Sequence, residues 1–322
     1  MKRINKIFLI CVFIVSLAGC SNTNNEETKH IMQNSKKITL NRLPQGAAGE
    51  EVSSVEVTAD TDGLFEKDEK VYEVIPHEYS DKDIQNVAET LGIEIEERKK
   101  ENDNVKQYSF DNGGYLTCYH ATGSLSYISN YANMDDGTRS IQFNKKKCKQ
   151  IAEKFIKESE ILEMDDMELV NIDVCQSVEK YDGTEIPISY SVYYKKCSPS
   201  EGVDYYGVGP GIKIEIDNSY SIHSFISVDK DISATKDSYR TISEDDMIDA
   251  ILDGSNVSID GSSEGEKLRV KIDDVSLCLY SDPVTEEQEY MAPYYVLSGE
   301  DENNSEVTIV VPAIEEEFIQ YK

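Results

Sequence analysis

Residues 212–217 read Ile-Lys-Ile-Glu-Ile-Asp, a strict alternation of apolar and charged side chains. Successive side chains of a β-strand point to opposite faces, so this stretch predicts a strand with its isoleucines in a core and its charges in water. The turn residues Asp217-Asn218 and a second strand-like run, Ile222 to Val228, follow directly. The stretch therefore predicts a hairpin of an antiparallel sheet that is buried on one face only.

Three stretches with helical spacing of apolar residues each precede a group of strand-like runs. The first spans about Asp81 to Leu91, the second runs from Asn144 to about Leu162, and the third begins at Ser243. Each starts with a residue type that caps helices. This order predicts an α+β fold, with tandem units of one short helix packed on a three- to four-stranded antiparallel sheet. We expect Ile212 to Ile216 or Val307 to Val311 to lie at a sheet edge.

The same order divides the chain into five parts. Residues 1–19 read as a lipoprotein signal peptide, and the polar residues 20–36 read as a flexible stalk. The three α+β units then occupy residues 37–143, 144–236 and 237–322, which is the usual size range for small domains.

The first twenty residues have the organisation of a bacterial lipoprotein signal. Three basic residues within the first six precede an apolar run from Ile7 to Val15, and Leu17-Ala18-Gly19-Cys20 follows as a lipobox. The apolar run is too short to cross a bilayer of roughly 30 Å, so we expect it to be removed. In the lipoproteins that this pattern resembles, the cysteine is lipidated, and here that residue is Cys20. We therefore expect a lipid-anchored protein on the extracytoplasmic face of the cell membrane. An ordinary secreted protein is the alternative.

The charge of the chain limits its partners. Acidic residues outnumber basic residues by 62 to 32, which gives a net charge of −30. The negative electrostatic field of such a chain repels the phosphate backbones of nucleic acids, so the composition excludes nucleic acid as a partner. Such a charge keeps a tethered protein soluble, and it leaves open a basic partner or divalent cations.

The number and spacing of the cysteines predict neither a metal site nor a set of disulfide bonds. Five of them follow Cys20, an odd number at wide spacings without a CxxC pattern. We expect no zinc site and interpret them as buried thiols. A bridge between Cys175 and Cys197 on neighbouring strands is the alternative.

Several short motifs accompany the repeated order of helix and strands. They are Ile151-Ala152-Glu153-Lys154-Phe155-Ile156, Asp182-Gly183-Thr184-Glu185-Ile186-Pro187-Ile188, and Ala292-Pro293-Tyr294-Tyr295-Val296-Leu297-Ser298-Gly299. With the lipobox, these motifs resemble the PepSY-like repeats of Gram-positive surface proteins. The chain is more distantly similar to the YycH and YycI accessory proteins of a sensor kinase, although those are usually held by a transmembrane helix. The resemblance spans roughly residues 70–318 and implies binding or inhibition, not catalysis.

The residues that usually carry catalysis or bind metal are scattered. We find no ligand-spaced partner for any of the four histidines, and Cys118 beside His120 reads as an ordinary pair on a sheet surface. We expect His223 on the solvent-facing side of its strand. Asp60-Thr61-Asp62-Gly63 resembles the start of an EF-hand loop, but the later acidic ligands are out of place. We predict no catalytic residue, no metal and no cofactor. The histidines are His30, His77, His120 and His223.

The glycine-rich stretch Gly207-Val208-Gly209-Pro210-Gly211 opens a strand and not a helix, so it does not read as a phosphate loop. Tyrosines lie close to it in the sequence, and the stretch favours a simple hairpin with those tyrosines facing the core. A mobile aromatic lip beside a strand edge is the alternative, and it is the most ligand-like feature of the chain. The candidate lip residues are Tyr193, Tyr205, Tyr206, Gly207, Gly209 and Gly211.

These observations favour a non-enzymatic, lipid-anchored surface protein that binds and modulates another envelope protein, using an exposed strand edge. The alternative is a lipid-anchored binding protein for a small ligand, peptide or cation, with the lip as its mouth. An enzymatic function has the least support, because no motif meets the geometric needs of an active site.

Overall fold

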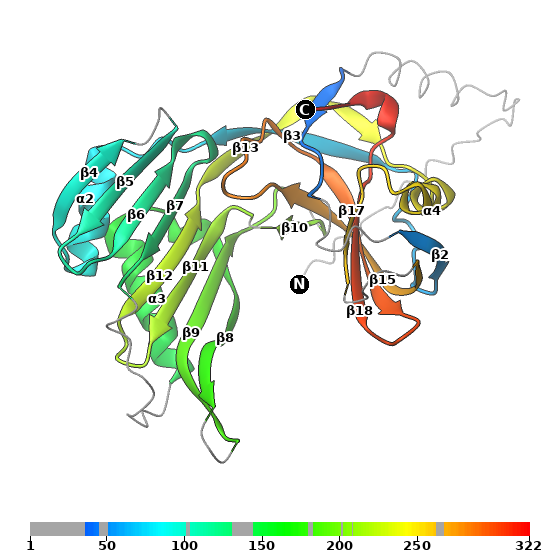
Figure 1. Cartoon of the computed structure of the whole chain (residues 1–322). Helices are drawn as coiled ribbons and strands as arrows, with labels where there is room; N and C mark the ends of the chain where they lie inside the picture. The colour runs from blue at the N-terminus through cyan, green and yellow to red at the C-terminus, as the bar shows by residue number, and fades with distance from the viewer. Residues whose placement is uncertain are drawn as a thin grey trace, which may run out of the picture. The chain divides into compact units, whose positions relative to one another are not determined.

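The computed structural model describes residues 36–44, 51–100, 104–130, 144–179, 183–200, 202–207, 209–261 and 267–322 (Figure 1). The predicted signal peptide, the predicted lipidation site Cys20 and all of the predicted stalk but Lys36 lie outside these residues. Residues 36–322 form one unit by their internal contacts. Within the described ranges, no helix has both the length and the apolar character that a membrane span requires.

The larger of the two main sheets has eight strands, and each strand is antiparallel to its neighbours. At its middle β7 pairs with β12, and Tyr127 lies opposite Phe225. This pairing joins a meander of four strands to four later strands in one continuous sheet. In spatial order the strands are β4 (Ile95–Lys100), β5 (Val105–Phe110), β6 (Tyr115–Tyr119), β7 (Ser124–Ile128), β12 (Ile222–Val228), β11 (Gly211–Asp217), β9 (Glu185–Lys196) and β8 (Met167–Glu179).

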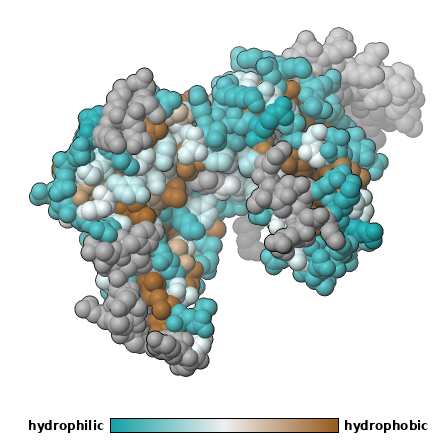
Figure 2. All heavy atoms as spheres, in the orientation of Figure 1, coloured by the Kyte–Doolittle hydropathy of each residue, from teal (hydrophilic) through white to brown (hydrophobic). Residues whose placement is uncertain are grey.

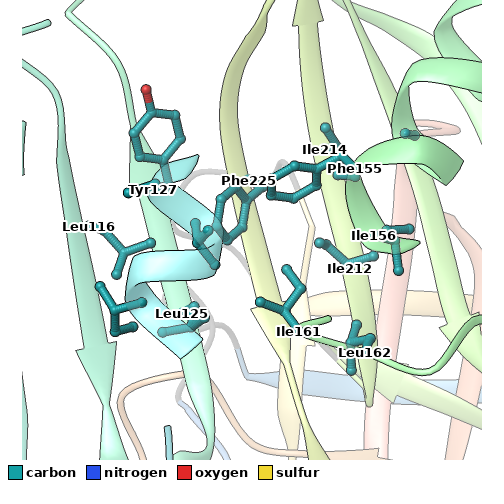
Figure 3. Close-up of a cluster of buried hydrophobic side chains, with 14 of the residues drawn as sticks. Leu116, Leu125, Tyr127, Phe155, Ile156, Ile161, Leu162, Ile212, Ile214 and Phe225 are labelled. Atoms are coloured by element: carbon teal, nitrogen blue, oxygen red, sulfur yellow. The ribbon is translucent and has the colours of Figure 1, made fainter. Parts of the chain in front are cut away.

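Two helices, α2 (Asp81–Leu91) and α3 (Lys145–Ser159), cover one face of this sheet. Ser80 caps α2 and Asn144 caps α3, because each side chain accepts a hydrogen bond from a backbone amide in the first turn of its helix. The apolar faces of both helices and the strands share one core. Figure 3 shows Phe225 of that core between two other rings, with centroid distances of 5.6 Å to Tyr127 and 5.1 Å to Phe155.

The second main sheet has six strands and contains most of the C-terminal part of the chain. The helix α4 (Glu244–Asp253) packs on one face, and the pair β1 (Ile38–Leu40) and β19 (Ile319–Tyr321) packs on the other, so both faces are buried. Antiparallel neighbours are β15 (Leu268–Ser281), β17 (Pro293–Asp301), β18 (Glu306–Pro312) and β14 (Ser258–Asp260). Strands β2 (Val52–Val57) and β10 (Asp204–Gly207) run parallel to β15.

A third, small sheet connects the two large ones. It consists of β13 (Lys230–Arg240), β3 (Asp68–Pro76) and β16 (Tyr290–Met291). The chain enters the eight-stranded sheet after β3 and leaves it into β13, so residues 77–229 are an insertion between two paired strands. The early strands β1 and β2 pair with the C-terminal part of the chain and not with the meander that follows them. Short 3₁₀ turns complete the elements: η1 (His120–Thr122), η3 (Met164–Asp166) and η4 (Glu316–Phe318).

The predicted fold class is wrong, because the strands do not form a small sheet for each helix. Strands from different predicted units pair into sheets of eight and six. A four-stranded sheet exposes two unpaired edges, and the β7–β12 pairing satisfies one edge of each meander. Both predicted edge strands are wrong as well, since β11 lies between β12 and β9, and β18 lies between β17 and β14. The predicted starts of the three helices are confirmed.

We predict that Phe225→Ala lowers the free energy of unfolding by about 3–5 kcal/mol, the usual cost of removing a buried aromatic side chain. Phe225 is 1 % exposed and contacts the ring of Tyr127, in the other half of the eight-stranded sheet, and the ring of Phe155, in the helix α3. The neighbouring Ile226 is 42 % exposed, so Ile226→Ala serves as the control and should change stability by roughly 0.5 kcal/mol or less. Urea unfolding of both variants measures the difference, and equal losses would contradict this account of the core.

Candidate binding surface

The face of the eight-stranded sheet that the helices leave uncovered carries hydroxyl and carboxylate side chains. The alternation in β11 sends its isoleucines into the core and sends Glu215 to this open face, as the sequence predicts. Ser191 of β9 and Ser224 of β12 lie directly opposite Glu215 in the ladder. Residues that face each other across a ladder share one side of the sheet. The open face therefore has polar groups from three adjacent strands at its centre.

Glu215 is held by three side-chain donors. Its carboxylate accepts hydrogen bonds from the Ser189 hydroxyl at 2.5 Å, from the Ser224 hydroxyl at 2.9 Å and from the Gln176 amide at 2.9 Å. Only 8 % of Glu215 is exposed, although the sequence predicts a solvent-facing residue. These hydrogen bonds satisfy the oxygens of the carboxylate and offset the cost of its burial. The network fixes β8, β9, β11 and β12 relative to one another on the open face.

A shallow pocket of about 440 Å³ lies on this face, within the size range of small-ligand sites. Its polar lining includes Asn171 and Asp173 of β8, Tyr193 of β9 and Lys213 of β11. Ile226 of β12 adds an apolar contact. The pocket thus combines an aromatic ring, an amide and two opposite charges, which suits a neutral or zwitterionic polar group.

The predicted lip residues divide between two environments. Tyr193, Gly207 and Gly211 line the open-face pocket. Tyr205 instead packs against the core of the six-stranded sheet, and the ring of Tyr206 stacks on Tyr280 at 6.2 Å between centroids. Tyr205 and Tyr206 lie within β10, which pairs with β15, whereas Gly207 is the last residue of β10 and reaches the pocket.

Gly209 lies between these two environments, since a Cβ added there would meet Tyr205 at 3.2 Å and the Tyr193 hydroxyl at 3.8 Å. Val208 of the glycine-rich stretch lies outside the described residues.

Strand β8 forms the end of the sheet next to this pocket. Hydrogen bonds at the ends of β8 and β9 show which backbone N–H and C=O groups of β8 point toward β9 and which point outward. The Cys197 amide, just after β9, donates to the Asp166 carbonyl, just before β8, at 2.9 Å. The Lys196 amide donates at 2.8 Å to the Pro210 carbonyl, on the other side of β9. Backbone groups alternate along a strand, so the odd-numbered residues of β9 bond to β8 and the even-numbered residues bond to β11.

This alternation identifies the free backbone groups of β8. Asn171 and Asp173 lie opposite Tyr193 and Ser191, two odd-numbered residues, and therefore bond to β9. Ile172 and Val174 direct their N–H and C=O groups away from β9, toward the outer edge. No other strand pairs with that edge in the part of the chain that the structure describes. Register shifts at Val170 and Cys175 flank this regular stretch of β8.

The surface of β8 is unusually apolar for an outer strand. Ten of its thirteen residues are exposed, including Leu169, Val170, Val174 and Val178. Hydrophobic surface is visible in Figure 2 where β8 and β9 run in Figure 1. The strand at the opposite end of the sheet, β4, has the sequence IEERKK, and charges of this kind discourage edge pairing. The two ends of the sheet therefore differ in chemistry.

The histidines and cysteines that the sequence singles out do not form a nucleophilic centre. The Cys118 sulfur lies 3.8 Å from the His120 ring nitrogens, but burial raises the pKa of this thiol to about 11. A thiol with a raised pKa is a poor nucleophile because the thiolate is the reactive form. The prediction for His223 is wrong, since it is buried at a bulge of β12 and its Nδ1 lies 2.6 Å from the Ser129 hydroxyl. That contact fastens β12 to the end of β7.

The EF-hand-like stretch is a turn in which the Asp62 amide donates to the Asp60 carboxylate at 3.2 Å. Thr61 donates to Glu244 of α4 at 3.0 Å, so the loop is fastened to that helix. Among the described residues, no group of three His, Cys, Asp or Glu side chains is arranged to hold a metal ion. The five cysteines after Cys20 are free thiols, with Cys175 and Cys197 exposed. His30 lies outside the described residues.

A buried polar cluster, which the sequence did not indicate, lies where β13 begins. Lys230 is 2 % exposed, and its ammonium donates to the Gln288 amide oxygen at 3.3 Å. The Asp282 carboxylate accepts from the Asn41 amide at 2.9 Å. Burial lowers the pKa of Lys230 to about 8 and raises the pKa of Asp282 to about 6. Thr122 of the inserted segment donates to the Val284 carbonyl at 2.7 Å in the same loop, so we interpret this cluster as a structural junction.

We predict that Asp282→Asn flattens the pH dependence of stability between pH 4 and 6. The folded-state pKa of about 6 exceeds the unfolded value of roughly 3.9, so the carboxyl contributes stability below pH ~4 that is lost as the pH rises through 6. The stability of the wild type relative to Asp282→Asn should therefore fall over this range, by about 2 kcal/mol. Urea unfolding at a series of pH values measures the difference. If the difference in stability between the two proteins did not change with pH, the raised pKa of Asp282 would be contradicted.

Comparisons with known proteins assign no activity. No protein-family model matches the chain, and no curated protein matches it. Among solved structures, the chain is similar to the crystal structure of an uncharacterized protein from Eubacterium rectale ATCC 33656, with 12 % sequence identity and a TM-score of 0.43. The similarity covers 81 % of this chain and 89 % of that chain.

Proposed function

We propose that this chain is a lipid-anchored, non-enzymatic binding protein of the cell envelope, and that its β8 edge pairs with an extended segment of another envelope protein. The observation that carries the proposal is the outward-facing backbone of Ile172 and Val174 on an exposed, apolar outer strand. Adding a strand to such an edge gains main-chain hydrogen bonds, while alternate side chains provide specificity. The lipobox at Leu17-Ala18-Gly19-Cys20 and the PepSY-like motifs support the location and the class of function.

The contrast between the two ends of the sheet supports β8 over β4 as the docking strand. Natural proteins protect unpaired edges with charges, and β4 carries five charged residues among its six. Strand β8 has fewer charged residues than its length would allow, and it exposes three valines and a leucine instead. Exposed apolar side chains on an unpaired strand are an aggregation risk that a permanent or frequent partner removes.

A second candidate function is the binding of a small polar ligand in the open-face pocket. The pocket of about 440 Å³ and its lining by Tyr193, Lys213 and Asp173 favour it. Asn171 and Asp173 are residues of β8 that also line the pocket. A peptide strand bound at β8 would therefore lie directly beside the pocket.

We predict that Val174→Pro abolishes capture of the partner in intact cells, whereas Val174→Ala does not. Proline removes the outward amide of Val174, and its ring obstructs a strand that approaches this edge. Alanine at the same position leaves every backbone group in place. The measurement is chemical cross-linking of the tagged protein in the cells that produce it, followed by purification and identification of cross-linked proteins.

The Cys20→Ala variant controls for anchoring, because it should leave the docking edge intact but move the protein away from its membrane partner. A stoichiometric protein that is captured by the wild type and Val174→Ala, and lost with Val174→Pro, supports the proposal. Equal capture by the proline and alanine variants would exclude the β8 edge. A protein-free preparation that contains a small molecule would favour the pocket.

A further inference from the structure

One side chain already occupies the edge that the proposed function leaves to a partner. The Lys145 ammonium, at the first residue of α3, donates to the Ile172 carbonyl at 2.5 Å. This carbonyl is one of the groups that face away from β9. A partner strand needs the same acceptor for its own backbone amide. Lys145 and a partner strand therefore compete for one hydrogen bond.

The position of Lys145 is unfavourable for the helix itself. The N-terminal end of a helix carries a partial positive charge, which favours acidic residues there. Accordingly, α2 and α4 have acidic residues in their first turns, whereas α3 has none and begins with Lys145, Lys146 and Lys147. Helix stability thus gives no reason for a lysine at this position, but the contact with the β8 edge does.

The charges of β8 indicate which kind of strand suits it. Glu168, Asp173 and Glu179 are exposed acidic residues, and the strand contains no lysine or arginine. Of the apolar residues of β8, Met167 and Ile172 pack against the core on the helix side. A strand paired with β8 would place one set of its side chains next to this apolar side and the alternate set next to the acids. Cationic residues on the alternate set complement the acids of β8 and the net charge of −30.

We propose that the β8 edge binds an extended segment in which apolar and basic residues alternate, and that Lys145 closes this edge until such a segment displaces it. This inference rests on the proposed function, because it assigns the chemistry of the partner and the regulation of the same edge. The ammonium of Lys145 supplies a positive charge and one hydrogen-bond donor, which are the two features that the incoming segment brings.

The test uses the purified full chain and two short fluorescein-labelled peptides, one that alternates valine with lysine and one that alternates valine with glutamate. Fluorescence anisotropy at low salt measures their affinities, because salt screens exposed charge pairs. We expect the valine–lysine peptide to bind about tenfold more tightly than the valine–glutamate peptide, since several exposed ion pairs replace repulsions. Lys145→Met should tighten its binding about fivefold, because one competing hydrogen bond is lost.

Lys146→Met is the matched control, since it removes the same charge from the adjacent residue of α3. It should leave the affinity of the valine–lysine peptide within about twofold of wild type, because its charge is exposed and screened. Equal effects of the two methionine variants would overturn the role of Lys145. Equal affinity of the two peptides, both sensitive to Val174→Pro, would overturn the basic partner but leave the β8 edge as the docking site. Binding that is insensitive to Val174→Pro, or no binding of either peptide, would overturn the proposed function as well.

Discussion

The structure depends on the need to pair the edges of β-sheets. Each four-stranded half of the inserted segment has two edges with unpaired backbone groups, and the β7–β12 pairing satisfies one edge of each half. Side-chain packing reinforces the same pairing, because the Phe225 ring of β12 stacks on Tyr127 of β7 and also contacts Phe155 of α3 in a tilted arrangement. One consequence is that the two halves share a single core. The other is that the remaining edges lie at β4 and β8, the two ends of the sheet.

The two faces and the two edges of this sheet therefore have different roles. The helices α2 and α3 bury one face, and the other face keeps a hydrogen-bonded carboxylate, Glu215, with a pocket beside it. One edge is protected by charges, whereas the edge of β8 exposes apolar residues and is partly closed by Lys145. If, as we propose, a partner strand displaces Lys145, the same edge is shielded from pairing in the free protein and becomes available to the partner.

Local features of the fold could be predicted from the sequence, and long-range pairings could not. Capping residues such as Ser80 and Asn144 act within one helical turn, so the sequence shows them directly. The pairing of β2 with β15 joins segments about 200 residues apart, and no local pattern specifies it. Lys230 and Asp282 illustrate the same limit, because charged residues are usually exposed and only the fold brings them together in a buried site. For the candidate lip, sequence proximity suggested one cluster, but β10 carries Tyr205 and Tyr206 into another sheet.

Residue-resolved hydrogen exchange along β8 in the free protein shows whether this strand has a free edge. Asn171 and Asp173 should exchange slowly, because their amides bond to β9. Ile172 and Val174 should exchange quickly, since Lys145 occupies a carbonyl and leaves these amides exposed to water. Such an alternation of slow and fast amides would support an edge that is open to a partner strand. Slow exchange at all four residues would show that the edge is already paired and would contradict the account.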